Sequence, residues 1–291
     1  MKNWGFPLML DTEGCQIRTG NKGVIHLTAG DKIKIWKKEV VCNSKNFYFS
    51  PIDSLSHFKV GDILHLDFDS SMIKVSSISK DFLTARVLIG GEVGASKGVH
   101  FDSKFRLPTY SKKDLRAIEL AKKYKVKHFT LSFINNKDDL IEFGKLCPST
   151  NYIAKVETKD ALDNLDDILS HTKEILIDRG DLSRYVPLEK MPFIVAAIIK
   201  RAHKKGVRVY VAGSTIEKMF NSLKSNQSEA TDIATLLEQG ADGIILTKET
   251  AVGKHPIETI NFLNSIVREF YNRKKNRYDI KDLSRNNLPK P

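Results

Sequence analysis

The first third of the chain alternates apolar and polar residues over short stretches. Residues 23–27, 32–36 and 62–66 each show this alternation. Turn-forming residues separate such stretches, at 29–31, 60–62 and 89–91. Several short strands at this spacing, without helical periodicity, predict a small all-β barrel or sandwich. We expect this domain to span residues 20–97.

From residue 98 onward the pattern changes to apolar runs that alternate with amphipathic stretches. The apolar runs are 129–134, 152–156, 175–177, 207–211 and 243–246. The helical patterns between and after them are 138–146, 159–169, 187–204, 228–239 and 256–271. Strands buried on both faces and separated by such helices predict a parallel sheet in an α/β fold.

The regular repetition favours a (β/α) barrel of the TIM type over an open doubly wound sheet. No GxGxxG motif follows any of the predicted strands, which argues against a dinucleotide-binding fold. We expect the barrel domain to comprise residues 1–19 and 98–272, with the small β domain inserted into it. A basic tail, 273–291, follows.

Composition places the chain among ordinary globular proteins, with 41% hydrophobic and 28% charged residues in 291. No apolar run reaches membrane-spanning length, so we expect a cytoplasmic protein with no membrane partner. Cys15, Cys42 and Cys147 are widely separated and form no CxxC pair. This pattern is typical of a reducing compartment and argues against a disulfide framework or a zinc site.

The net charge of +12 admits two interpretations, nucleic-acid binding or a preference for small anionic substrates. The basic stretch 273–277 contributes to the excess, but such a run is usually a solvated tail. The sequence contains no RNP-type aromatic motif and no glycine turn of the helix-turn-helix kind. We therefore expect a small anionic substrate and no nucleic-acid partner.

Polar side chains gather where the predicted barrel strands end, which is where parallel barrels place their active sites. Lys155 and Glu157 lie two residues apart on one strand, so their side chains leave the same face. A structural ion pair would explain these two residues alone. Asp181, after the next strand, adds a second carboxylate and favours an oxygen site for Mg²⁺ or Mn²⁺.

Gly180 lies in the predicted turn between a strand and a helix. A glycine there allows close backbone approach, and the N–H groups that follow it can hold a carboxylate or a phosphate. A simple turn glycine is the alternative interpretation. The combination with Asp181 and Lys155 favours the binding role.

Six stretches of the chain resemble pyruvate kinase motifs and occur in the same order. LDTEGCQIRTG at 10–20 resembles LDTKGPEIRTG, and IAKVE at 153–157 resembles ISKIE. GADGIILTKET at 240–250 resembles GADCIMLSGET. The other three are KGV at 97–99, LSFI at 131–134 and RGDL at 179–182, the last resembling ARGDLG. The chain is therefore similar to the pyruvate kinase family, from about Pro7 to Phe270.

The resemblance implies a role for each matching residue. Lys155 would stabilise negative charge on the transferring phosphoryl group and on an enolate, and Glu157 and Asp181 would bind Mg²⁺ or Mn²⁺. Backbone groups at Gly180 and Asp181 would receive the substrate carboxylate. The remaining matches are two ligands of a potassium ion, Asp11 and Thr12, and two contacts to the phosphates of ADP or ATP, Arg18 and Lys97.

The chain also departs from the family pattern. Where the family has ATQMLE, this chain has AGSTIE at 212–217. Gly213 therefore replaces a threonine that the family uses in substrate binding and proton delivery. Ser214 and Thr215 are the candidate substitutes, although neither is in register, and we expect Ser214 to bind substrate. Glu13 and Gln16 replace a lysine and a glutamate.

The family's first two barrel strands and its C-terminal domain have no counterpart in the sequence. We therefore expect an incomplete barrel whose edge strands, near 8–11 and 243–246, pair with a second copy or with another chain. That partner would also supply the arginine that grips the substrate phosphate.

Three functions fit these observations. The first is a pyruvate-kinase-like, magnesium-dependent enzyme that transfers phosphoryl groups and acts on phosphoenolpyruvate, pyruvate or a similar 2-oxo acid. The second is a metal-dependent lyase or aldolase on the same scaffold, because a metal-bound enolate also serves carbon–carbon chemistry. The third is a non-catalytic regulatory or binding relative. Lys155, Glu157 and Asp181 together argue against the third.

Overall fold

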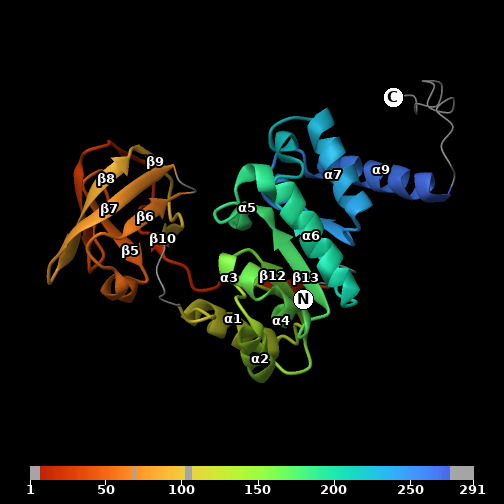
Figure 1. Cartoon of the computed structure of the whole chain (residues 1–291), viewed down its shortest axis with the longest axis horizontal. Helices are drawn as coiled ribbons and strands as arrows, with labels where there is room; N and C mark the ends of the chain where they lie inside the picture. The colour runs from red at the N-terminus through yellow and green to blue at the C-terminus, as the bar shows by residue number, and fades with distance from the viewer. Residues whose placement is uncertain (1–6, 68–69, 102–106, 276–291) are drawn as a thin grey trace. The chain divides into compact units, whose positions relative to one another are not determined.

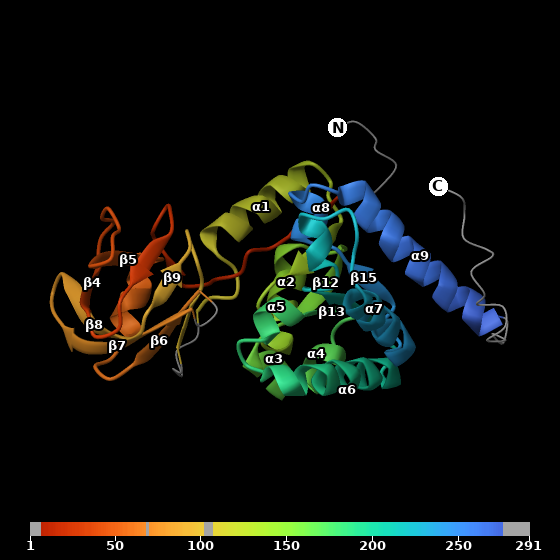
Figure 2. The same cartoon turned by 90° about the horizontal axis from the view of Figure 1, so that it is seen from above.

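The computed structural model describes residues 7–67, 70–101 and 107–275, which form two compact units. The β unit comprises Asp11–Val126. The barrel unit comprises the residues before Asp11 together with those from Lys127 onward. Figures 1 and 2 show the elements of both units. In the described residues, no helix is both long and apolar enough to cross a lipid bilayer.

The β unit is built on a seven-stranded sheet with the strand order β10-β6-β7-β8-β4-β5-β2. Its strands are β2 (Arg18–Thr19), β4 (Lys32–Trp36), β5 (Asn46–Ser50), β6 (Ile63–Leu66), β7 (Ser71–Ile78), β8 (Phe82–Ile89) and β10 (Val99–Phe101). A second, two-stranded sheet pairs β3 (Ile25–Leu27) with β9 (Gly91–Val93) in antiparallel fashion, and a 3-10 turn, η1 (Ile52–His57), follows β5.

The alternating pattern seen in the sequence accounts for the core of this unit. In β4, Ile33 and Ile35 are buried while Lys32 and Lys34 are exposed. Residues of the other strands, such as Phe47 in β5, join the same apolar cluster. Period-two alternation thus gives each strand one face in the core and one in solvent. The exact domain limits, residues 20 and 97, remain a prediction.

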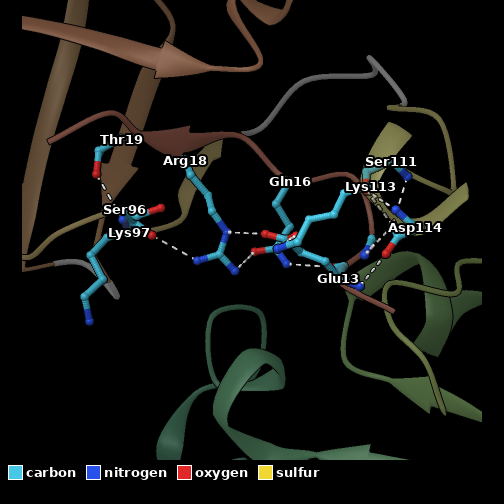
Figure 3. Close-up of polar contacts among 10 residues, drawn as sticks. Glu13, Gln16, Arg18, Thr19, Ser96, Lys97, Ser111, Lys113 and Asp114 are labelled. Atoms are coloured by element: carbon cyan, nitrogen blue, oxygen red, sulfur yellow. Dashed lines mark hydrogen bonds and ion pairs between the residues drawn. The ribbon is translucent and has the colours of Figure 1, made fainter. Parts of the chain in front are cut away.

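Helix α1 (Lys112–Lys123) also belongs to the β unit, and a capping box fixes its start. Ser111 accepts from the backbone of Asp114, while the Asp114 carboxylate accepts from the backbone of Ser111. The buried carboxylate of Asp114 also accepts the N–H groups of Glu13 and Gly14, at 2.7 and 3.1 Å (Figure 3). One side chain therefore joins the segment after β1 to the start of α1.

Replacing Asp114 by Ala is expected to lower the free energy of unfolding by about 2–3 kcal/mol. The variant loses a helix cap, at ~1 kcal/mol, and leaves buried N–H groups without an acceptor. Urea denaturation measures the change, and Glu119→Ala on the exposed side of the same helix is the matched control. Equal stability of the two variants would show that Asp114 does not hold this junction.

The barrel unit is built on a six-stranded sheet in sequence order, β1-β11-β12-β13-β14-β15. These strands are β1 (Met9–Asp11), β11 (His128–Leu131), β12 (Asn151–Val156), β13 (Glu174–Asp178), β14 (Arg208–Ala212) and β15 (Gly243–Ile245). Successive pairs from β11 to β15 are parallel. This confirms the predicted α/β fold with an incomplete TIM-type barrel. Among the described residues, β1 and β15 stand at the two ends of the strand order.

Helices connect these strands and lie around them in Figure 2. They are α2 (Lys137–Leu146), α3 (Lys159–Asp163), α4 (Leu165–Leu169), α5 (Arg179–Leu182), α6 (Met191–Lys204), α7 (Gln227–Gln239), α8 (Lys248–Ala251) and α9 (Pro256–Lys275), with 3-10 turns η2 (Leu188–Lys190) and η3 (Glu217–Phe220). The predicted basic tail lies outside the described residues except for 273–275, which end α9.

The helix expected over 159–169 is in fact two short helices, α3 and α4. The break falls at Asn164, whose backbone angles, φ −105° and ψ 20°, are not helical. Its side-chain amide donates to the carbonyl groups of Asn135 and Asp160, at 3.1 and 3.0 Å. Asparagine bonds readily to nearby backbone groups, and this competes with helix formation.

Candidate metal and active site

Lys155 is the centre of a buried polar group in the barrel unit. It lies on β12, and only 9% of its surface is exposed. Its Nζ lies 3.1 Å from Glu157 Oε2 and 3.2 Å from Asp178 Oδ2, and donates to Ser132 Oγ at 3.3 Å. These partners come from β12 and from the ends of its two neighbours, β11 and β13. Three adjacent strands therefore hold one ammonium group.

Three carboxylates in this group lie close enough together to share a metal ion. One oxygen each from Glu157, Asp178 and Asp181 lie within 4.8 Å of one another. Asp178 ends β13, and Asp181 belongs to α5, which follows directly. Asp181 also forms an ion pair with Arg184 at 3.0 Å. The predicted pair, Glu157 and Asp181, is thus brought together, with Asp178 in addition.

The surroundings of Glu157 indicate that these three carboxylates suit a metal cation. Its side chain is fully buried, and Oε1 accepts the N–H of Phe133 at 2.7 Å. Among the described residues, Oε2 accepts no hydrogen bond, and it lies 3.1 Å from the Lys155 ammonium group. Mg²⁺ and Mn²⁺ are hard ions that carboxylate oxygens bind well. The residues present therefore fit such an ion.

Burial raises the pKa of the Glu157 carboxyl from its usual 4.5 to about 7. The Lys155 charge opposes this rise, Asp181 and Asp178 add to it, and the Phe133 N–H opposes it. Because the folded state then binds a proton more tightly than the unfolded chain, stability falls as pH rises through this range.

In metal-free protein, we expect the free energy of unfolding to fall between pH 4.5 and 7 because of this group. Glu157→Gln cannot ionise, so its stability should change less over the same interval. Urea denaturation in the presence of a chelator at pH 5 and pH 7.5 measures both. Glu142→Gln, on the exposed face of α2, should keep the wild-type dependence. If the stability of the Glu157→Gln variant depended on pH as that of the wild type does, the raised pKa could not belong to Glu157.

Asp178 was not predicted from the sequence as a site residue. It could have been noticed, because the family stretch ARGDLG begins with alanine where this chain has Asp178. In the structure its Oδ1 accepts the Gly180 N–H at 3.1 Å, as the cap of α5. The N–H predicted to receive a substrate carboxylate thus already holds a carboxylate of the protein.

Gly213 and Ser214 follow β14. Gly213 has a φ of +88°, and a Cβ there would lie 2.9 Å from the nitrogen of Gly180. Its carbonyl accepts two hydrogen bonds from Arg179, at 3.0 and 2.7 Å. Ser214, predicted to bind substrate, is exposed, and its hydroxyl donates to Glu217 at 3.3 Å. Its predicted role remains untested.

The other predicted residues belong to the β unit, where Thr12 is buried and Asp11 is exposed. Figure 3 shows the surroundings of Arg18. Its guanidinium group donates to Gln16 Oε1 and to the Ser96 carbonyl, both at 2.9 Å, and lies 4.0 Å from Glu13.

Lys97, the second predicted phosphate contact, lies 3.5 Å from Asp67. Glu13 and Gln16 are the two residues that depart from the family pattern in this stretch, and both contact Arg18. Acidic or amide groups of the protein therefore engage both predicted phosphate-binding cations.

Most of the chain is similar to known pyruvate kinases. The family model described as "Pyruvate kinase, barrel domain" matches residues 2–260. The pyruvate kinase of Thermotoga maritima is 31% identical over 273 residues, which cover 90% of this chain and 58% of that protein. The chain belongs to the pyruvate kinase family.

Two further relatives have similar sequence identity to this chain. The pyruvate kinase of Geobacillus stearothermophilus is 30% identical over 89% of this chain and 46% of its own length. Pyruvate kinase isozyme G, chloroplastic, of Ricinus communis is 29% identical over 89% of this chain and 63% of its own length. The chain thus spans between about half and three-fifths of the length of these curated relatives.

Proposed function

We propose that this chain carries the metal centre of a pyruvate-kinase-like phosphotransferase. The substrate would be phosphoenolpyruvate, pyruvate or a similar 2-oxo acid in its enol form, and the second substrate ADP or ATP. The observation that supports this most is the grouping of Lys155 with Glu157, Asp178 and Asp181 in a barrel of this family. A structural ion pair with Lys155 would not require a third carboxylate, Asp181, beside Glu157 and Asp178.

Each residue of the group has a role in such a reaction. Glu157 and Asp181, with Asp178 within reach, would hold Mg²⁺ or Mn²⁺, which when bound supplies positive charge to substrate oxygens. The Lys155 ammonium group would stabilise the negative charge of the phosphoryl group and of the enolate. Its contacts with Glu157 and Ser132 fix its position before substrate arrives. Burial of the group strengthens these charge interactions.

The nucleotide and the potassium ion would bind through the β unit and the residues next to it. Arg18 and Lys97 would contact nucleotide phosphates, and Asp11 and Thr12 would bind K⁺, as the family pattern implies. Arg18 would have to exchange Gln16 and Ser96 for phosphate oxygens. We therefore expect weaker nucleotide binding than a free arginine would give.

An assay with phosphoenolpyruvate and ADP, in the presence of Mg²⁺ and K⁺, tests this function. We expect pyruvate and ATP to form and a chelator to stop the reaction. A screen of 2-oxo acids is run alongside. Turnover of a 2-oxo acid without phosphoryl transfer would favour the lyase or aldolase. Absence of both turnover and Mn²⁺ binding would favour a non-catalytic relative.

We also propose that another polypeptide pairs with the edge strands of the six-stranded sheet. β1 and β15 end the strand order among the described residues, and unpaired strand edges associate readily. A second copy or a separate chain would extend the sheet at these two ends. Light scattering and hydrogen exchange test this proposal. A strict monomer at micromolar concentration with both strands protected would contradict it.

A further inference from the structure

Asp178 holds both groups that were predicted to hold the substrate. Oδ2 lies 3.2 Å from the Lys155 ammonium group, and Oδ1 accepts the N–H of Gly180 at 3.1 Å. A 2-oxo acid presents a carboxylate with the same charge and the same two oxygens. The side chain of Asp178 therefore offers Gly180 what the substrate carboxylate would offer it, and it gives Lys155 a negative oxygen in place of the enolate.

Helix capping explains only part of this arrangement. Aspartate is a common N-cap residue, and the bond to Gly180 is of that kind. The contact with Lys155 is different, because a cap needs no cation on its second oxygen. The Asp178 side chain is only 19% exposed, so its ion pair with Lys155 is largely shielded from solvent. This second contact suggests a role beyond capping.

A second departure from the family pattern lies beside the first. A Cβ on Gly213 would be 3.6 Å from Asp178 Oδ1. The family has a threonine at the position of Gly213 and an alanine at the position of Asp178. Compared with the family, this chain therefore lacks a side chain at Gly213 and has an additional carboxylate at Asp178, which lies close to it in space. The polar group next to Gly180 now comes from β13 instead of from the turn after β14.

We propose that Asp178 is a specificity-determining residue that competes with a 2-oxo acid for Lys155 and Gly180. This inference rests on the proposed function, since it concerns substrate binding at the same centre. A 2-oxo acid must displace Asp178 from both partners and enter beside its negative charge. The wild type therefore binds such acids more weakly than a variant without this carboxylate.

Pyruvate binding to the full chain tests the proposal directly. Saturation-transfer NMR gives the pyruvate dissociation constant for the wild type, Asp178→Ala and Asp178→Asn, each with and without Mn²⁺. The alanine variant should bind pyruvate about tenfold more tightly or better, because charge-assisted bonds to Lys155 and Gly180 become available. The asparagine variant keeps the cap on α5 but loses the negative charge, so its affinity for pyruvate should rise several-fold.

Asp163→Ala is the matched control, since Asp163 is an exposed aspartate that pairs only with Lys159 in the described residues. It should leave pyruvate binding unchanged. Equal or weaker binding by both Asp178 variants, with and without Mn²⁺, would overturn the inference. Failure of every protein to bind Mn²⁺ would instead overturn the proposed metal site, and the pyruvate comparison without metal would still decide the role of Asp178.

Discussion

Lys155→Met is expected to reduce the rate of phosphoryl transfer by ~10²–10³, the usual loss when a preorganised charge is removed from an active site. Methionine keeps the length and the apolar stem but leaves Glu157 and Asp178 without their cation. Removal of one partner from a buried ion pair costs ~3–5 kcal/mol of stability. The rate is therefore measured at saturating Mn²⁺, where bound metal offsets the unpaired carboxylates.

Lys159→Met provides the comparison for this variant. Lys159 is an exposed lysine that pairs with Asp163 one helical turn away, and such pairs contribute little. Its rate should match that of the wild type. A loss of less than tenfold in the Lys155 variant would mean that this lysine serves packing and not the reaction.

Glu157→Gln is expected to weaken Mn²⁺ binding by at least ~10²-fold. Even residues that only support metal ligands change affinity by ~10–100-fold, and Glu157 is proposed as a ligand itself. Glutamine preserves the shape and one oxygen but removes the charge from a fully buried position. Isothermal calorimetry of Mn²⁺ binding gives the affinity, with Glu142→Gln as the surface control. Unchanged affinity would remove Glu157 from the site.

Local sequence patterns predicted most of the fold, because the periodicity of apolar residues determines which face of a strand or helix is buried. The apolar runs at 152–156 and 175–177 correspond to β12 and β13, which pair in parallel inside the barrel unit. Alternation in 32–36 predicted β4 and its buried face. Such features depend on side chains a few residues apart.

The helix break at Asn164 depended on a partner remote in sequence. Asn135 lies 29 residues earlier in the chain, and its carbonyl accepts the Asn164 amide. Apolar periodicity across 159–169 continues through the break, so periodicity alone predicted one helix. Only the folded chain brings the competing hydrogen bond into place.

The candidate site was predictable where the residue types repeat the family pattern, and not where they depart from it. Lys155, Glu157 and Asp181 could be named because each stands at the end of a predicted strand. Asp178 follows directly after the apolar run 175–177 and was assigned no role, and its contact with Lys155 follows from the parallel register of β12 and β13. The contact of Glu13 with Arg18 likewise depends on the turn between them.

A crystal structure with Mn²⁺, in which anomalous scattering locates the ion, tests the central claim most directly. The metal centre proposed here predicts one Mn²⁺ bound by carboxylate oxygens of Glu157 and Asp181, within reach of Asp178 and beside Lys155. An ion found only elsewhere on the chain, with these carboxylates still paired to Lys155 and Arg184, would contradict it.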